Sequence, residues 1–552
     1  MSLSPPPSHF QANFGNRRIT SSYRHAAPAG PWPFIDNLAD QTSEAEANSK
    51  LAAHIGICHH NPSPCKECKN WTAYPQKQFK NWTRNPTKKS GIWCAVQGWD
   101  LVESTVYTVN VMNSGSFDAS VKPFLVTNKN KKTFWDELKA DRGSDIRARA
   151  LFVDKMSGPV LQILGTTYLI EPFFFSSSIN WIPSRYQENV IPKEGDHITV
   201  TLVFIRSIPQ ALVDNGRAPE WPMGSRSRTG TRLGSTEEID LQHGPRLPLR
   251  SGGQVLCEDL LALHMVRNRV GGSTLISYHP NNGYTNAEDL RMRLKLVGDS
   301  VYWGSIFEHS KDPTFVLLAL LWSALYSWDE ALENLYAHFC LLEEKVMDTN
   351  DMEITRELHT IRAHLLHYAS LLEEFRKSVV FVRDTRNPAM DSCEPKEDRA
   401  RDRARLDKEC RNLLSEIDRL KMDRKMQEER VQNVMQLVFT SVNIADSDAM
   451  KRLSNLNMFF LPATFVAGIF GMNVKELVID TRGSLVHYFE IAVPLTLMTL
   501  WLGITFQIRY AFINPKASIW RELSRPLEWF LYPLIYFFTS CFSRGRSTSH
   551  YS

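Results

Sequence analysis

The feature that most constrains this chain is a pair of apolar runs that lie close together near its C-terminus. The first covers residues 459–473 and ends in the tripeptide Gly471-Met472-Asn473, and the second covers residues 491–508. A short polar loop separates them. Because about 20 predominantly apolar residues cross a bilayer as a helix, the two runs predict a hairpin of membrane helices.

A long helix is predicted to lead into the first run. From residue 398 onward the chain has no proline before Pro462 and no glycine before Gly468. Apolar and small side chains recur at alternating spacings of three and four, a heptad pattern with polar breaks. The positions are Leu413, Ile417, Leu420, Val431, Val434, Val438, Ser441 and Ala445, with Arg424 and Gln427 in the same seam. A simple dimeric coiled coil is the alternative, but the stripe continues into an apolar run, which favours a stalk helix over residues 399–455.

The pattern within the first run is specific because of where it stands. Residues 460–473 read Phe-x-Pro-x-Thr-x-x-x-Gly-x-x-Gly-Met-Asn, at the end of the first of two runs that follow a long helix. From about residue 406 to residue 508 the chain resembles the CorA family of magnesium channels. The resemblance implies a CorA-like architecture: an α/β soluble domain, a long stalk helix and two transmembrane helices, assembled as a homopentamer. It also implies Mg²⁺ as the transported ion and as a candidate regulatory ion.

The resemblance assigns roles along one face of the first membrane helix. Gly471, Met472 and Asn473 correspond to the selectivity motif at the outer mouth. Asn473 would hold the metal through ion-bound water, because Mg²⁺ dehydrates reluctantly. The pore-lining positions are Ser447, Met450, Leu453, Asn457, Leu461, Thr464 and Gly468. The three large apolar side chains among them correspond to constrictions that gate by dewetting.

Simpler roles remain open for some of these residues. Met450, Leu453 and Leu461 would serve equally in ordinary packing between helices, and Asn473 would serve as a solvent-exposed helix cap. Gly471 is expected to take a positive φ, which glycine accepts, so that the chain turns sharply after the helix.

The loop after the tripeptide departs from the family pattern. The family usually carries Met-Pro-Glu there, whereas this chain has Lys475 and no proline. Two acidic residues of the outer loop remain, Glu476 and Asp480. A non-conducting CorA-like membrane scaffold or sensor is therefore the alternative function. Asn473 argues against this alternative, because a protein that does not conduct ions has no need of a ring of Asn473 side chains at the mouth of a pore.

Charges around the predicted spans indicate that both termini are cytosolic in a multi-pass membrane protein. The spans are placed at residues 456–474 and 488–508, with an outer loop at residues 475–487. The loop carries balanced charges, whereas basic residues flank the outer ends of the hairpin. These are Lys451, Arg452, Arg509, Lys516, Arg521 and Arg525. The sequence does not decide between the plasma membrane and an organelle membrane.

The C-terminal tail, residues 509–552, is basic and contains one more apolar stretch. This stretch, residues 529–542, is short, contains Pro533 and has Glu528 at its edge. These features favour an interfacial helix lying on the membrane over a third span.

The N-terminal part is predicted to form a soluble α/β domain. Residues 1–99 read as a mostly disordered tail rich in Pro, Ser and Asn, residues 100–310 as the α/β domain with a loop insertion near residues 209–253, and residues 311–398 as its helical part. Strands are expected at residues 105–111, 149–153, 160–170 and 197–205, and helices at residues 133–140 and 353–382. Prolines in residues 385–395 predict a hinge.

Two apolar segments of this part need separate interpretation. Residues 315–326 are too short for a membrane helix and are followed by acidic residues, so a buried core helix is favoured over a span. Residues 173–183 are unusually aromatic, and a packed turn after a core strand is favoured over a binding surface.

Composition excludes several classes of function. With 64 basic and 60 acidic residues, the chain lacks the charge excess of a nucleic-acid-binding protein. It has no phosphate loop, nucleophile elbow or metalloprotease helix, so no enzyme and no covalently bound cofactor are expected. The partners implied are membrane lipid, further copies of the chain and divalent cations.

Cysteines give a weak and separate signal. The nine cysteines are scattered, which does not indicate a disulfide framework. Cys58, Cys65 and Cys68 lie near His59 and His60, which permits either a zinc site or a flexible thiol-bearing tail. The tail is favoured because no second pair of ligands follows downstream.

Overall fold

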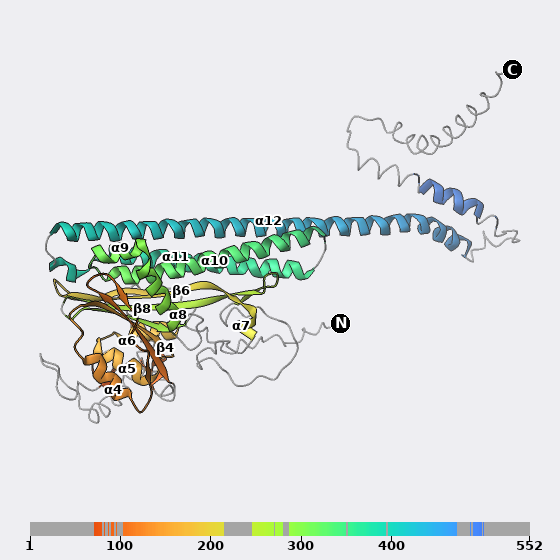
Figure 1. Ribbon diagram of the computed structural model, residues 1–552. Helices are drawn as coiled ribbons and strands as arrows, with labels where there is room; N and C mark the ends of the chain where they lie inside the picture. The colour runs from red at the N-terminus through yellow and green to blue at the C-terminus, as the bar shows by residue number, and fades with distance from the viewer. Residues whose placement is uncertain are drawn as a thin grey trace, which may run out of the picture. The chain divides into compact units, whose positions relative to one another are not determined.

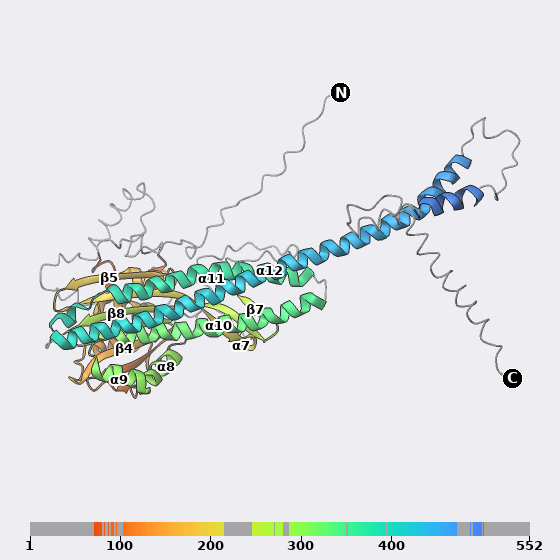
Figure 2. The ribbon, with the colours of Figure 1, turned by 90° about the horizontal axis from the view of Figure 1, so that it is seen from above.

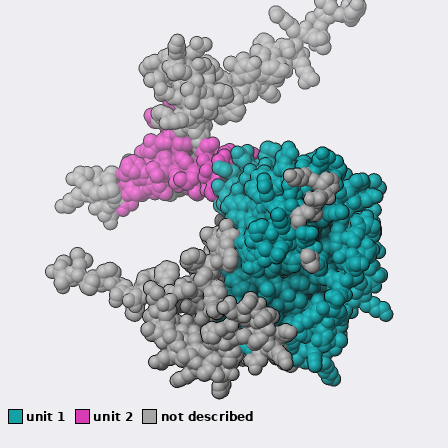
Figure 3. Space-filling model, turned by 90° about the vertical axis from the view of Figure 1, so that its left-hand side faces the viewer, with its two compact units in different colours: residues 1–435 teal, residues 436–552 magenta. Residues whose placement is uncertain are grey.

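The computed structural model describes residues 71–79, 82, 87, 90–92, 95–96, 103–214, 246–269, 271–279, 286–348, 352–392, 396–471, 486, 489–499 and 501. The chain divides into two compact units, residues 1–435 and 436–552, which Figure 3 colours separately. Helix α12 (Lys396–Phe470) begins in the first unit and ends in the second.

Among the described residues, the first unit is built around one mixed sheet of nine strands in the order β2-β1-β4-β9-β8-β6-β5, with β3 on β1 and β7 on β8. The strands are β1 (Ser104–Met112), β2 (Phe117–Asp118), β3 (Phe124–Val126), β4 (Ile146–Asp154), β5 (Ser184–Ile191), β6 (Gly195–Pro209), β7 (Leu247–Leu249), β8 (Gln254–Asn268) and β9 (Ser273–His279). Strands β4 and β9 are parallel, and the other pairs are antiparallel.

Helices cover both faces of this sheet, so that the unit has three layers (Figures 1 and 2). On one face lie α8 (Ala287–Asp299), α9 (Val301–His309), α10 (Thr314–Asp348), α11 (Met352–Asp384) and the first part of α12. On the other lie α4 (Lys131–Lys139), α5 (Gly158–Thr167) and α6 (Pro172–Ile179). The central strands β6 and β8 are buried almost throughout, as expected for strands covered on both sides. The short elements η2 (Trp71–Ala73), α7 (Gln210–Asp214) and η3 (Pro388–Ser392) complete the unit.

Helix α10 confirms the interpretation of residues 315–326 as part of a buried core helix. Among the described residues, Thr314–Val346 is the helix whose length and composition would suit a membrane span, yet 72% of its apolar window is buried inside the protein. Its apolar side chains pack toward the sheet, where α10 contacts β6 and β8. Burial inside the unit accounts for its apolar composition without a membrane.

The heptad seam of α12 packs against helices of its own chain. Leu413, Ile417, Leu420 and Val431 are buried, and Val434 nearly so. The polar members of the seam bond to backbone of the two neighbouring helices. Arg424 donates to the Leu365 carbonyl of α11 at 2.9 Å, and Gln427 donates to the Leu332 carbonyl of α10 at 3.0 Å. The pattern in this part of α12 therefore forms an intrachain three-helix layer.

Two predictions for the region after β4 are wrong. Residues 160–170, predicted as a strand, form most of α5, and residues 173–183, predicted as a packed turn, begin with α6. Each helix has a proline in its first turn, which favours helix initiation. Both helices are buried on nearly all sides, so their sequences lack the polar face that distinguishes a helix from a buried strand. In the predicted loop insertion at 209–253 the structure places α7 and β7, and residues 215–245 lie outside the described residues.

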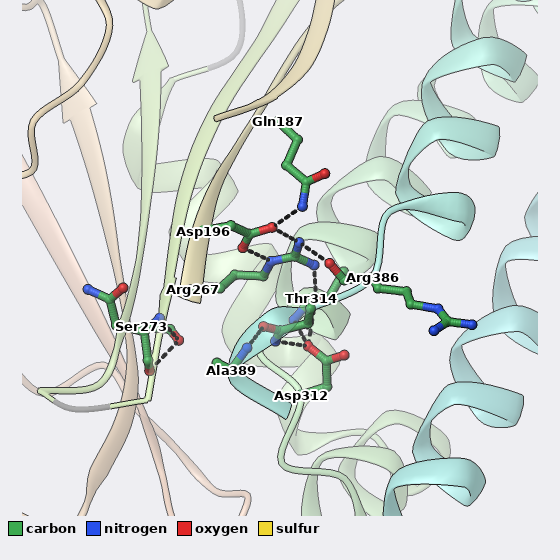
Figure 4. A network of polar contacts seen from close by, with 10 residues as sticks. Gln187, Asp196, Arg267, Ser273, Asp312, Thr314, Arg386 and Ala389 are labelled. Carbon is green, nitrogen blue, oxygen red and sulfur yellow. Dashed lines mark hydrogen bonds and ion pairs between the residues drawn. The ribbon is translucent and has the colours of Figure 1, made fainter. Parts of the chain in front are cut away.

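A buried ion pair joins the sheet to the helical layer (Figure 4). Arg267 of β8 and Asp196 of β6 are both fully buried, and the Arg267 Nε donates to Asp196 Oδ1 at 2.7 Å. Arg267 also donates to Thr314 Oγ1 at the start of α10, at 3.1 Å, and to the Arg386 carbonyl after α11, at 2.9 Å. One guanidinium thus ties two strands to the ends of two helices.

We predict that Arg267→Met destabilises the protein by about 3–5 kcal/mol, because it leaves the Asp196 carboxylate buried without a counter-charge. Thermal unfolding of the purified full-length protein would measure the change. Arg250→Met is the matched control, since the exposed Arg250–Glu353 pair should contribute no more than about 1 kcal/mol. Adding Asp196→Leu to Arg267→Met should recover most of the loss. Equal melting temperatures for Arg267→Met and Arg250→Met would contradict the prediction.

Candidate functional site

The predicted pore-lining residues all lie on one uninterrupted helix. The seven positions, Ser447, Met450, Leu453, Asn457, Leu461, Thr464 and Gly468, are in α12, and each is exposed in the single chain. Their spacings of three and four place them along one face. The large apolar members are strongly exposed: Met450 by 69%, Leu453 by 59% and Leu461 by 67%. Such side chains on one stripe indicate a surface that another molecule covers.

Within the second unit, residues 436–552, another helix contacts a different stripe of α12. Residues Phe489–Thr499 form a short apolar helix within the second predicted span. Thr499 Oγ1 donates to the Met458 carbonyl of α12 at 3.5 Å, while Pro462 and Val466, one and two turns further along, are buried. Each residue turns an α-helix by about 100°, so this stripe faces away from the one that carries Leu461. The second helix therefore leaves the predicted pore stripe uncovered.

Proline in α12 explains the contact with Thr499. Pro462 has no N–H, so it cannot bond to the Met458 carbonyl four residues earlier. The Thr499 hydroxyl of the neighbouring helix lies 3.5 Å from that carbonyl, and it also donates to the Thr496 carbonyl of its own helix at 2.9 Å. In membrane helices, hydroxyl side chains commonly satisfy the carbonyl groups that proline frees. This contact was not predicted from the sequence, although Pro462 is a signal for a hydroxyl donor on the second predicted span.

Thr464, a predicted pore position, bonds to its own helix. Its Oγ1 donates to the carbonyls of Phe460 and Leu461, both at 3.0 Å. The hydroxyl proton is thus held by the backbone, and the oxygen lone pairs remain as acceptors. An exposed acceptor of this kind can take a hydrogen bond from a water bound to a cation.

The two glycines near the end of α12 differ in their surroundings. A Cβ at Gly468 would meet no atom within 4 Å, so this position leaves open space on the exposed face. The Gly471 N–H donates to the Ala467 carbonyl at 2.9 Å, and its φ is not in the left-handed region. The expected positive φ at Gly471 is therefore wrong, because the helical hydrogen bonding continues through this residue. A Cβ there would lie 3.2 Å from the Ala467 carbonyl, which is tight.

Other predicted site residues lie outside the described part of the chain. They are Met472, Asn473, Glu476 and Asp480, together with Cys58, His59, His60, Cys65 and Cys68. The same holds for residues 529–542, for most of the outer loop and for the second half of the second span.

The rest of α12 in the second unit is apolar on more than one side. Leu456, Phe460 and Phe465 are more than half exposed in the single chain and are not among the seven predicted pore positions. A helix that is hydrophobic around its circumference is stable when it is surrounded by apolar material. This surface suits lipid or neighbouring copies of the chain.

Part of the chain matches a known protein family. Residues 270–509 match the model of the family described as CorA-like Mg²⁺ transporter protein. No curated protein matches the chain. Among solved structures, the complete CorA magnesium transporter from Methanocaldococcus jannaschii is 15% identical, with 73% of this chain and 96% of that chain covered and a TM-score of 0.43. The full-length CmaX protein is 13% identical, with 73% and 97% covered and a TM-score of 0.42. The similarity to the CorA-like Mg²⁺ transporter family thus covers residues 270–509, somewhat less than half of the chain.

Proposed function

We propose that this protein is a transmembrane channel for Mg²⁺ or related divalent cations. The hydrated ion is selected at a ring formed by Gly471, Met472 and Asn473, and flux is gated by apolar rings on the first membrane helix. The family match over residues 270–509 supports cation transport. The observation that carries the pore is the exposed stripe of α12, which the neighbouring helix leaves uncovered.

Assembly around an axis would bury this stripe. Head-to-tail contacts between identical copies close into rings, and five copies are what the resemblance to the CorA family implies. In such a ring Met450, Leu453 and Leu461 would form stacked apolar constrictions. Asn457, Thr464 and Gly468 would give polar or open levels between and above them. The membrane helices of the proposal cover residues 456–474 and 488–508.

Cation flux in liposomes that contain the purified protein tests the proposal directly. We expect Mg²⁺ influx down an imposed gradient, measured with an entrapped fluorescent indicator, and none in empty liposomes. A correctly assembled oligomer that passes neither Mg²⁺ nor other divalent cations would overturn the channel and favour a non-conducting scaffold or sensor. That alternative is based on the loop after the tripeptide, where the family's usual Met-Pro-Glu is absent and Lys475 is present.

We predict that both termini face the cytosol, because the basic residues that flank the two spans lie on their terminal sides. Epitope tags at Met1 and Ser552 should both be protected from protease added outside intact cells, and both should be cleaved after permeabilisation. A tag inserted in the outer loop after Asp480 is the matched control. It should be accessible from outside, or from the lumen if the protein resides in an organelle. An accessible C-terminal tag would contradict the prediction and indicate a third span at residues 529–542.

A further inference from the structure

Three side chains with metal-ligating groups converge on the sheet of the first unit. Glu188 lies on β5 directly opposite His197 on β6, and His264 lies on β8 opposite Thr199. Residues two apart on a strand share a face, so the three side chains project to the same side. One ligand atom from each, a carboxylate oxygen or an imidazole nitrogen, lies within 4.8 Å of the other two.

The cluster lies under α6 and is shielded from solvent. The Phe174 ring of α6 stands 5.3 Å from the His264 ring, and the two imidazoles are 5.5 Å apart in an edge-to-face arrangement. The His264 side chain is fully buried, whereas the side chains of His197 and Glu188 are 11% and 18% exposed. This face is opposite to the one on which Arg267 meets Asp196, so the cluster is separate from that ion pair.

The three converging atoms have no hydrogen-bond partners. Glu188 Oε1, His197 Nδ1 and His264 Nε2 are each buried and unbonded. The separation of Glu188 Oε1 from His197 Nδ1, 3.7 Å, is too long for a hydrogen bond. Buried polar atoms in folded proteins are nearly always satisfied, so three unbonded atoms on side chains of one cluster indicate a bound species there.

The hydrogen bonding of His264 favours a metal ligand. Its Nδ1 lies 2.8 Å from Thr199 Oγ1. When Nδ1 carries the proton and donates to Thr199, Nε2 keeps a lone pair that can bind a metal ion. Metal-binding histidines are usually oriented in this way by a partner on the other ring nitrogen.

We propose that Glu188, His197 and His264 bind a Zn²⁺ ion in the soluble unit, with water as the fourth ligand. Two imidazoles and one carboxylate suit Zn²⁺, whereas Mg²⁺ prefers oxygen ligands alone. In a tetrahedral zinc site the ligand atoms stand about 3.4 Å apart, so the widest pair would close by at most about 1.4 Å. The site is therefore distinct from the transport pathway, and the bound ion would tie β5, β6 and β8 together.

Zinc titration of the purified full-length protein tests this site. Any purification tag is removed, because tags can bind zinc. Three substitutions, Cys58→Ser, Cys65→Ser and Cys68→Ser, are introduced together to eliminate thiols near the N-terminus. Calorimetry and elemental analysis should then give one Zn²⁺ per chain, undisplaced by excess Mg²⁺. Glu188→Gln and His197→Gln should each weaken binding by at least about 100-fold. His364→Gln, at another buried histidine, is the matched control and should leave binding unchanged.

Thermal unfolding supplies a second readout that does not depend on transport. A ligand that binds only the folded state raises its stability, so Zn²⁺ should raise the melting temperature of the starting protein and of His364→Gln. Zn²⁺ should leave the melting temperatures of the folded Glu188→Gln and His197→Gln variants unchanged. A water molecule that bridges the three atoms is the competing account. It predicts no stoichiometric zinc, or equal zinc binding in all four proteins, and either result would overturn the proposal.

Discussion

Replacing Asn473 with alanine is expected to nearly abolish Mg²⁺ flux while leaving expression and oligomer assembly intact. The carboxamide oxygens of the proposed ring accept hydrogen bonds from water molecules bound to the ion, and alanine removes them. A hydrogen bond that involves a charged partner contributes about 1.5–3 kcal/mol. Losing even one from the ring would lower occupancy at the mouth by about tenfold or more. Liposome flux, compared at equal amounts of reconstituted oligomer, measures the effect.

Asn455→Ala is the matched control for this variant. Asn455 belongs to α12 but stands two residues from both Leu453 and Asn457, so helical spacing places it off the proposed pore stripe. The same chemical change at this position should leave flux near the wild-type value. Wild-type flux from Asn473→Ala would remove Asn473 from selectivity and favour its alternative role as a solvent-exposed helix cap.

The sequence predicted the parts of the fold whose residue patterns have one explanation. Alternation and β-branched residues located β1, β4 and β6, and the absence of proline and glycine located α12. The pattern did not distinguish α5 from a strand or α6 from a packed turn, because burial on all sides removes helical periodicity. It also did not show what covers the seam of α12. Heptads fit a partner chain as well as α10 and α11, and the contacts to Leu332 and Leu365 depend on tertiary packing.

The candidate site, like the fold, was predictable from the sequence only in part. The resemblance supplied the seven predicted pore positions, and their spacing predicted one helix face. In the structure all seven lie on α12 and are exposed. The contact between Thr499 and Met458 joins residues 41 positions apart, so no local pattern contains it. The cluster of Glu188, His197 and His264 was missed for a related reason. Its ligands come from three strands, and strand order and register brought them together.

Enlarging the proposed apolar constriction should open the channel. A narrow apolar ring excludes water, and a hydrated divalent ion cannot pass without it. Leu453→Gly removes the ring's side chains, and Met450→Asp hydrates the neighbouring level. Each should raise basal Mg²⁺ flux by about tenfold, which requires lowering the barrier by only about 1.4 kcal/mol. Each should also weaken inhibition by Mg²⁺ on the cytosolic side.

The alternative role for Leu453 and Met450, packing between helices, predicts the reverse: lower oligomer yield and lower flux. Glycine also weakens any helix by about 1 kcal/mol, so Leu453→Gly needs a control for that effect. Leu456→Gly provides it, because Leu456 is 56% exposed on the same helix but lies off the pore stripe. If the gate is apolar, only Leu453→Gly raises flux, although both variants carry the same helix penalty. Equal flux from both, or reduced flux from correctly assembled Leu453→Gly and Met450→Asp oligomers, would exclude a hydrophobic gate at these positions.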